Sequence, residues 1–299
     1  MVDDSDGGET EIGRGHLRDP SDTSFTMYRY EPSPSSLSWL RIFWIPVWKV
    51  PRGEVREQRI LTYPVCLLSI TSDYARLVGP QPAAARQPLK GHGWAFGAMF
   101  TPCAARAVLG PDRGIPVDRF VELGEVPLLA GLVPQVRAAM AADPAGEAGH
   151  RLACRLLEDR FSAVEPPAGE AVLINQVVRR VEEDPDITTV SALCDASGLQ
   201  ERMLQRLCAR FLGLTPRWLI RQRRLQEAGQ LLRHAPGPLS DVALRLGYAD
   251  QAHFSRDFRR ATGWTPGEFA ALAGSVPDST GRRSGVPPTP ESARGHRTD

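Results

Sequence analysis

Arginine side chains near the C-terminus follow one short pattern twice, at a fixed offset of 50 residues. Each copy has two arginines four residues apart, and then a glycine and a Thr-Pro pair. The copies are Arg206, Arg210, Gly213 and Thr215-Pro216, and Arg256, Arg260, Gly263 and Thr265-Pro266. Arginine can donate paired hydrogen bonds to guanine edges in the major groove, or it can neutralise phosphates. Because a repeat at a fixed distance indicates two similar structural units, the pattern predicts a protein that reads duplex DNA at two places.

The elements that must position these side chains are helices. Apolar residues at spacings of three and four predict helices from about 200 to 211 and from about 251 to 262, with Leu204 and Phe254 facing inward. Gly198 and Gly247 precede them, where a helix-turn-helix needs a tight turn. The outward residues are then Arg202, Gln205, Arg206 and Ala209 on the first helix, and Gln251, Ala252, Ser255, Arg256 and Arg259 on the second, with His253 at the border.

A long helix is expected between the two units, from Pro216 to His234. At about 1.5 Å per residue it would be roughly 28 Å long, which suits two reading helices about one DNA turn, roughly 34 Å, apart. Thr188 or Thr189 is expected to cap the short helix of the first unit, and Ser240 its counterpart over 241–246. A further helix ahead of both units has an apolar stripe, formed by Val172, Ile174, Val177, Val178 and Val181.

The whole chain predicts an α+β architecture, with a mixed, strand-rich N-terminal domain followed by an all-α C-terminal domain. Short apolar runs separated by Pro and Gly favour strands to about residue 133, and Ala- and Leu-rich sequence favours helices after it. The expected segments are a disordered acidic tail (1–24), an N-terminal sensing or dimerisation domain (25–164), a linker (165–170), a DNA-binding domain (171–273) and a disordered tail (274–299).

Charge is distributed unevenly along the 299 residues. The formal net charge of the chain is only +1, whereas residues 199–260 contain twelve Arg and no Lys against five acids, a local net charge of +7. A basic surface in a neutral chain is typical of a nucleic-acid face, although each such arginine is more often a solvated charge or an ion-pair partner.

The five cysteines and six histidines form no spacing typical of a metal site, so we expect no metal, no cofactor and no catalytic residue. An odd number of cysteines favours reduced thiols. No basic and then apolar leader follows Met1, and the most apolar stretch, 39–50, is too short and too interrupted to span a bilayer. A cytoplasmic protein without a membrane partner is expected.

Several motifs in the helical region match a known family. They are Leu204-Gln205-Arg206-Leu207, Gly213-Leu214-Thr215-Pro216-Arg217, Arg224-Leu225-Gln226-Glu227-Ala228, and the block that runs from Leu239-Ser240-Asp241-Val242-Ala243 into residues 247–260, GYADQAHFSRDFRR. Residues 174–273 resemble the DNA-binding domain of AraC/XylS-type transcriptional regulators. Two departures from the family pattern are Cys208, where a bulky apolar residue is usual, and Gln200, where a capping Ser is common.

The resemblance implies two helix-turn-helix units that insert into adjacent major grooves. It implies that Arg202, Gln205 and Arg206 read bases or phosphates in one groove, and Gln251, Ala252, His253 and Arg256 in the other. Phosphate contacts fall to Arg210, Thr215, Arg259 and Arg260. The partners expected of such a regulator are double-stranded DNA, a small-molecule effector, RNA polymerase and a second copy of the chain.

Residues 28–129 resemble an N-terminal domain found ahead of such DNA-binding units. The likeness is carried by Pro32–Trp44, Leu77–Pro80 and Gly97–Pro102. Cys103 follows the last of these as a departure, and we expect it to be buried rather than reactive. Four tryptophans (Trp39, Trp44, Trp48 and Trp94) could line a pocket for a planar or apolar effector, but core packing is the commoner role. Gly91, Gly93 and Gly97 are interpreted as turns.

Two other functions compete with a ligand-controlled regulator. The first is a DNA-binding protein with a cysteine-dependent alkyl-transfer or other enzymatic N-terminal domain, which would need an activated thiolate near His or a metal. The second is a regulator that binds no small molecule and is controlled by partner proteins or by its own abundance.

Overall fold

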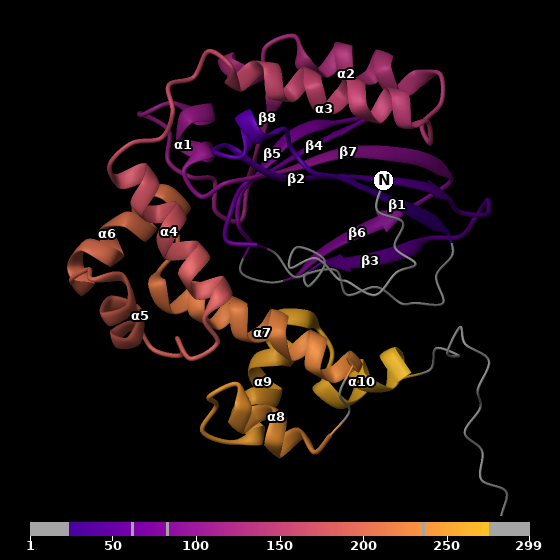
Figure 1. Cartoon of the computed structure of the whole chain (residues 1–299). Coiled ribbons are helices and arrows are strands. Elements are labelled where there is room, and N and C mark those ends of the chain that lie inside the picture. The colour runs from indigo at the N-terminus through magenta and orange to yellow at the C-terminus, as the bar shows by residue number, and fades with distance from the viewer. Residues whose placement is uncertain (1–23, 61–62, 82–83, 235–236, 275–299) are drawn as a thin grey trace, which may run out of the picture.

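The computed structural model of the chain describes residues 24–60, 63–81, 84–234 and 237–274 (Figure 1). The two tails expected to be disordered lie outside these residues except for Ser24 and Gly274. The strands are β1 (Phe25–Tyr30), β2 (Leu40–Lys49), β3 (Arg56–Ile60), β4 (Leu67–Thr71), β5 (Ala75–Val78), β6 (Ala85–Leu89), β7 (His92–Phe100) and β8 (Phe120–Glu122). The α-helices are α1 (Ala104–Leu109), α2 (Leu132–Ala141), α3 (Glu147–Phe161), α4 (Glu170–Glu183), α5 (Val190–Ser197), α6 (Glu201–Leu212), α7 (Pro216–His234), α8 (Leu239–Arg245), α9 (Gln251–Thr262) and α10 (Pro266–Gly274).

The N-terminal part is built on an antiparallel sheet with the strand order β1-β2-β7-β4-β5-β8. Helices α2 and α3 cover one face of this sheet, and β3 pairs with β6 in a separate two-stranded sheet (Figure 1). Phe43, Phe96 and Phe100 from the central strands are fully buried in the core that the sheet shares with these helices. The expected α+β fold class, strand-rich and then helical, is confirmed.

A β-bulge in strand β2 decides where Arg41 points. The register of β2 against β7 shifts between Leu40 and Ile42, so these two residues belong to different apolar clusters although they are two apart. A bulge inserts one residue into a strand and re-aims its side chain. The side chain of Arg41 is accordingly directed at α4, where it forms an ion pair with Glu182.

Two glycines in β7 make room for tryptophans of the neighbouring strand, which corrects their interpretation as turns. Gly97 faces Trp44 and Gly93 faces Trp48 in the β2–β7 register. A Cβ atom on Gly97 would lie 2.2 Å from Trp44 Cε2, and one on Gly93 would lie 2.3 Å from Trp48 Cζ2. Only glycine lets these half-buried indoles lie flat across the sheet. Trp39 and Trp94, by contrast, are buried in the core, as expected.

The helical part closely follows the expected pattern. Helices α7 and α9 have the predicted bounds, and Thr189 Oγ1 caps α5 by accepting from Ala192 N–H at 3.1 Å. Ser240 caps nothing, since α8 begins one residue before it, after Pro238. Val172 lies exposed at the domain interface rather than in the apolar stripe of α4, because the other four residues of that stripe already fill its inner face.

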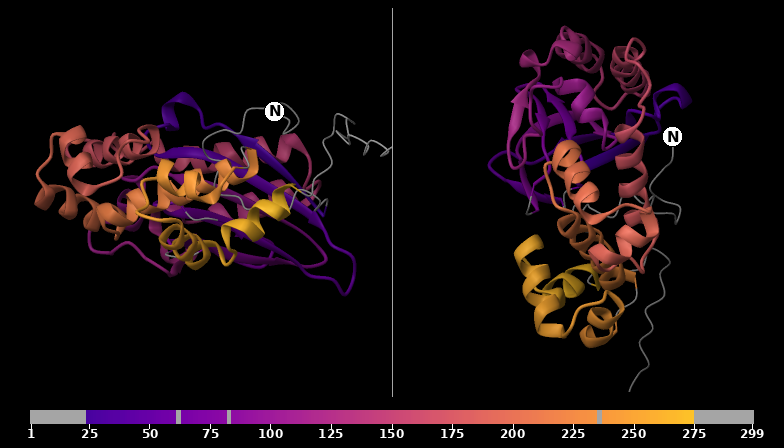
Figure 2. Two further views of the ribbon diagram at one scale, coloured as in Figure 1. Left: turned by 90° about the horizontal axis from the view of Figure 1, so that it is seen from below. Right: turned by 90° about the vertical axis from the view of Figure 1, so that its left-hand side faces the viewer.

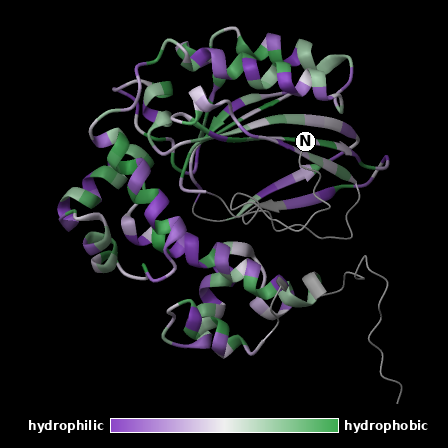
Figure 3. Cartoon of the chain, viewed as in Figure 1, coloured by the Kyte–Doolittle hydropathy of each residue, from purple (hydrophilic) through white to green (hydrophobic). Residues whose placement is uncertain are grey.

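The hydrophilic middle of α7 separates two apolar clusters (Figure 3). One cluster ends at Ile220 and includes α4, α5 and α6, and the other begins at Leu225 and includes α8, α9 and α10. Residues 221–224, Arg-Gln-Arg-Arg, are buried or half-buried between them. Each half of α7 is thus the central helix of one helix-turn-helix unit.

The N-terminal part contacts both of these units (Figures 1 and 2). Gly213, in the turn after α6, lies against Val117, so that a Cβ there would be 2.5 Å from Val117 Cγ2. Ala84, just before β6, packs against the second apolar cluster and donates its N–H to the carbonyl of Ala261 in α9 at 2.8 Å. The sheet domain therefore touches the first unit at α4 and at the turn after α6, and the second unit at the end of α9.

Candidate nucleic-acid interface

The first reading helix, α6, presents a basic face. Leu204, Leu207 and Cys208 are fully buried, which fixes the rotation of the helix and leaves Arg202, Gln205, Arg206, Ala209 and Arg210 exposed. Its N-terminus lacks a side-chain cap because Gln200 stands there. Gly198 takes up the left-handed conformation (φ 66°) at the preceding turn, as its position predicted.

The second reading helix, α9, repeats this arrangement. Phe254 and Phe258 are fully buried, whereas the predicted base-reading residues Gln251, Ala252, His253 and Arg256 and the phosphate contacts Arg259 and Arg260 are exposed. Asp250 caps the helix, because its Oδ1 accepts the N–H of His253 at 2.6 Å. Within the described residues no carboxylate forms an ion pair with Arg256 or Arg260. Both guanidinium groups are therefore available to a polyanion.

A polar network fixes α9 against α7. The carboxylate of Asp257 accepts hydrogen bonds from Arg221 Nε at 2.9 and 3.0 Å, and from the hydroxyl of Tyr248 at 3.0 Å. The guanidinium of Arg224 lies 3.9 Å from the centre of the Tyr248 ring. Burial, and then the neighbouring Asp257 carboxylate, raise the pKa of Tyr248, so the hydroxyl remains a donor. Sequence reasoning missed this network, because its members are far apart in the chain.

The first unit is held to α7 in a comparable way. Arg223 donates to the carbonyl oxygens of Pro185 and Ile187, each at 3.0 Å, and to Glu227 Oε2 at 2.6 Å. Its side chain is buried, and this burial lowers its pKa. Arg223 thus ties α7 to the loop between α4 and α5.

The two Thr-Pro pairs begin helices. Thr215 Oγ1 accepts the N–H of Trp218 at 3.2 Å at the start of α7. Thr265 forms a reciprocal pair with Glu268, in which each side chain accepts the backbone N–H of the other residue, at 2.7 and 3.2 Å. This is the capping-box arrangement, and its hydrogen bonds to Thr265 lower the pKa of Glu268. The repeated Thr-Pro therefore has a structural role in both units, whereas phosphate contact by exposed Thr215 stays a prediction.

Two of the basic side chains on α6 already have a partner. Glu170, the first residue of α4, accepts from Arg206 Nη2 at 3.0 Å through Oε1 and from Arg210 Nη1 at 2.5 Å through Oε2. No spacing rule predicts this contact, because 36 and 40 residues separate the partners. To bind Arg206 and Arg210, a DNA phosphate would therefore have to replace the carboxylate of Glu170.

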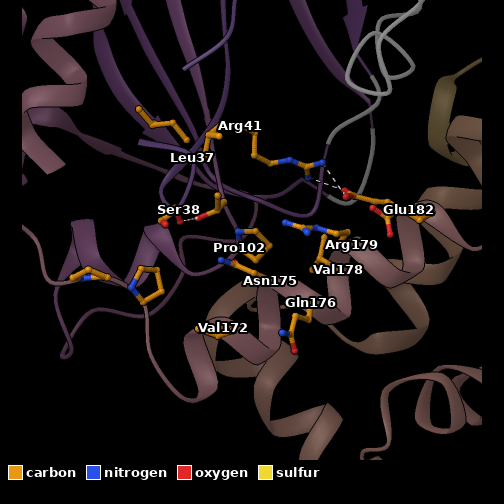
Figure 4. Close-up of a pocket in the computed structure, with 15 residues that line it drawn as sticks. Leu37, Ser38, Arg41, Pro102, Val172, Asn175, Gln176, Val178, Arg179 and Glu182 are labelled. Carbon is orange, nitrogen blue, oxygen red and sulfur yellow. Dashed lines mark hydrogen bonds and ion pairs between the residues drawn. The ribbon is translucent and has the colours of Figure 1, made fainter. Parts of the chain in front are cut away.

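A cavity of about 620 Å³ lies where α4 meets the sheet domain (Figure 4). Its lining includes Arg41 and Glu182, which form a two-fold ion pair at 2.8 and 2.9 Å. It also includes Asn175, whose side chain accepts the N–H of Cys103 at 3.0 Å and donates to its sulfur at 3.2 Å. No tryptophan lines this cavity or the smaller one between α4 and α5. The four tryptophans that could line an effector pocket therefore line neither of these two cavities.

The cysteines offer no activated nucleophile. Four of the five are buried, Cys103 among them as expected, and Cys194 is half-buried. Burial raises the pKa of the Cys66, Cys154 and Cys208 thiols to about 12. Among the described residues, no three His, Cys, Asp or Glu side chains gather as ligands of a metal would. No helix in the same part of the chain is long and apolar enough to cross a membrane.

Comparison with family models gives two matches. Residues 193–271 match a helix-turn-helix domain, a segment that contains both reading helices. Residues 28–121 match a domain of unknown function (DUF6597), which covers the sheet domain from β1 to β8.

Curated relatives match the C-terminal part of the chain. The HTH-type transcriptional activator RhaS of Enterobacter sp. (strain 638) is 33% identical over 111 residues, which are 37% of this chain and 40% of the relative. RhaS of Escherichia coli (strain K12 / DH10B) is 34% identical over 112 residues, with the same shares. The chain therefore spans about two fifths of the length of these relatives.

Solved structures give weaker overlaps. Fatty-acid-bound ToxT from Vibrio cholerae is 12% identical, with a TM-score of 0.40, over 86% of this chain and 99% of that one. The C-terminal domain of AraT, a response regulator from Geobacillus stearothermophilus, is 20% identical, with a TM-score of 0.32, over 42% of this chain and 97% of that one. At these scores neither structure bears on the ligand or the function of this chain.

The sequence matches and the geometry agree on the C-terminal part. It has two units of the same construction, each with a buried apolar side, a glycine turn and an exposed basic reading helix, and the helix-turn-helix match spans both. Residues 193–271 are therefore a helix-turn-helix domain with two such units, similar in sequence to the matching part of the RhaS activators.

Proposed function

We propose that the chain is a sequence-specific transcriptional regulator that places α6 and α9 in adjacent major grooves of one DNA duplex. The single observation that carries this proposal is the duplication. The two reading helices expose arginines at matching positions, Arg206 and Arg210 on α6 and Arg256 and Arg260 on α9. The units that carry these helices are both bonded to the same connecting helix, α7. A single basic helix is commonly no more than a solvent-exposed surface. Two basic helices held on one connecting helix suit duplex DNA, whose phosphates and grooves repeat along its axis.

The residues proposed to contact bases or the phosphates beside them are Arg202, Gln205 and Arg206 on α6 and Gln251, Ala252, His253 and Arg256 on α9. Those proposed to contact phosphates only are Arg210, Thr215, Arg259 and Arg260. Exposure of these positions supports the assignment, and so does the capping of α9 by Asp250, which fixes the N-terminal turn that enters a groove. Catalysis by a cysteine is disfavoured, because burial raises the pKa of these thiols.

Fluorescence anisotropy on a duplex selected by the purified protein from a random pool, and on a random duplex of equal length, tests the proposal. A specific reader would bind the selected duplex about 10³-fold more tightly or better, and log Kd would rise steeply with log salt, by about 0.9 for each phosphate contact. Equal affinity for both duplexes at every salt concentration would refute sequence-specific binding.

Control by a small molecule forms a second part of the proposal. The sheet domain contacts both helix-turn-helix units, so a ligand that alters this domain could reach the reading helices. A ligand-induced rise in the melting temperature of the full chain is expected for an effector, and its absence across a broad metabolite set would favour control by partners or by abundance. Pull-down of RNA polymerase and sedimentation on DNA test the two expected protein partners.

A further inference from the structure

Glu170 neutralises the two arginines on the side of α6 that faces α4. Its two carboxylate oxygens are shared between Arg206 and Arg210, at 3.0 and 2.5 Å. The guanidinium groups are well exposed, with 64% and 53% of the side-chain surface accessible, whereas Glu170 is only 27% exposed. The acid is thus the more fixed member of this three-residue contact, which we call the Glu170 clasp.

The backbone holds Glu170 in place. It is the first residue of α4, and Gly169 before it adopts φ 55° and ψ −122°, a conformation that glycine tolerates. Helix α4 is anchored by Ile174, Val177 and Val181, all buried. The backbone of Glu170 is therefore held in place by a packed helix, which keeps its carboxylate within reach of α6.

A carboxylate and a DNA phosphate bind arginine by the same charge-assisted hydrogen bonds. When a duplex approaches α6, its phosphates must displace Glu170 or lie beside a charge of the same sign. Either event costs free energy, which weakens binding of the first unit. In the second unit, Arg256 and Arg260 form no ion pair with a described carboxylate, so the two reading helices differ in this respect.

We propose that Glu170 is a built-in competitor of DNA, which occupies the place of a phosphate between Arg206 and Arg210 and so limits the affinity of the first helix-turn-helix unit. The inference rests on the proposed function, since it names how the same DNA-binding surface is restrained.

The same helix connects the clasp to the sheet domain. Asn175 and Glu182, further along α4, bind Cys103 and Arg41 of that domain, and the cavity of about 620 Å³ lies between these contacts and residues 166–167 (Figure 4). The helix that carries Glu170 is therefore also the helix that the sheet domain holds by these two contacts. The restraint lies on the helix through which the N-terminal domain reaches the DNA-binding surface.

The test compares Glu170→Gln with Asp195→Asn in the full chain. Both substitutions remove one negative charge from the first unit, but exposed Asp195 on α5 forms no ion pair with the arginines of α6. The probes are a duplex selected by the wild-type protein from a random pool and a random duplex of the same length, at several salt concentrations. Glu170→Gln should bind the selected duplex about three- to tenfold more tightly, with a salt slope steeper by about 0.9. Asp195→Asn should change the affinity by less than about twofold.

Equal affinities and slopes for the two variants, with wild-type discrimination between the duplexes intact, would overturn the clasp and leave the proposed function standing. If the wild-type protein does not discriminate between the duplexes, the proposed function and the inference fall together. A thermal melt checks folding. If Glu170→Gln does not fold, Glu170→Asp replaces it as the test variant. Its shorter side chain keeps the charge but cannot reach both arginines, so it should also bind DNA more tightly than the wild type. Unchanged DNA binding by this variant would again overturn the clasp.

Discussion

Replacing Asp257 with Asn tests whether the polar network holds the second reading helix on α7. The carboxylate accepts a bifurcated hydrogen bond from the Nε–H of Arg221 and a hydrogen bond from the hydroxyl of Tyr248. The side chain of Asp257 is 12% exposed, against 24% for Arg221. Removing one partner of a buried ion pair costs about 3–5 kcal/mol. Because Arg221 retains some solvent access and Asn retains one acceptor oxygen, we expect a loss of about 2–3 kcal/mol in the local stability of α9.

Hydrogen exchange measured by mass spectrometry on α9 peptides reports this loss directly, since it follows local opening. A loss of about 2–3 kcal/mol corresponds to exchange that is about 30- to 150-fold faster. Glu122→Gln is the matched control, because it breaks an ion pair with Arg76 whose side chains are 36% and 47% exposed. An exposed pair contributes about 0–1 kcal/mol, so this variant should exchange nearly as the wild type does.

The same variant should weaken DNA binding through α9 alone. We expect the affinity of Asp257→Asn for the selected duplex to fall while α6 keeps its exchange rates. Adding Arg221→Met should restore part of the stability, since it removes the unpaired charge. Wild-type exchange of α9 in Asp257→Asn, or an equal effect of Glu122→Gln, would refute the conclusion that this network fixes the helix.

Three further predictions concern packing, thiols and DNA contacts. Gly213→Ala should lower the free energy of unfolding by more than Gly198→Ala does. Both glycines have φ 66°, but only at position 213 would the added Cβ clash, with Val117. Equal losses of about 1 kcal/mol in urea titrations of the two variants would exclude this contact. At neutral pH a thiol reagent should modify half-buried Cys194 quickly and the four buried thiols only on unfolding, so fast reaction of several thiols would contradict the burial. Those buried thiols ionise more readily once unfolded, so their contribution to stability is present below about pH 8.5 and is lost as the pH rises toward 12. Arg256→Ala should weaken specific binding by about 1–3 kcal/mol, and an unchanged ratio of specific to random affinity would remove it from the base-reading set.

Local signals explain why the helical part was predictable from the sequence. The bounds of α9 follow from its apolar spacing, from Asp250 as the cap and from Gly263 as the left-handed residue at its end. The predicted cap at Ser240 is wrong because α8 begins at Leu239, directly after Pro238, and the predicted and observed starts are only two residues apart. The sequence favours turns at Gly93 and Gly97 because it does not show which side chains lie opposite them in the sheet.

The contacts that orient the site could not be predicted in the same way. Arg221 and Asp257 are 36 residues apart, and Glu170 is 36 residues from Arg206. Several carboxylates could pair with each arginine of this region, depending on how the helices pack. The spacing of charges in the sequence therefore does not identify the partner. Packing of the apolar clusters brings these groups together first, and only then does the ion pair have a defined geometry.

The polar middle of α7 explains how one helix can set the relation between two reading helices. Apolar contacts hold each unit on its own half of α7, but such contacts are non-directional and tolerate small rotations. Arg223 and Arg221 point to the first and the second unit respectively, and both make directional hydrogen bonds from the same turn of helix. Replacing these buried pairs with apolar residues could preserve stability, yet it would remove the bonds that fix the rotation of each unit about α7. Because a rotation of either unit would turn α6 or α9 away from its groove, we infer that buried Arg223 and half-buried Arg221 set the register between the two units rather than adding stability.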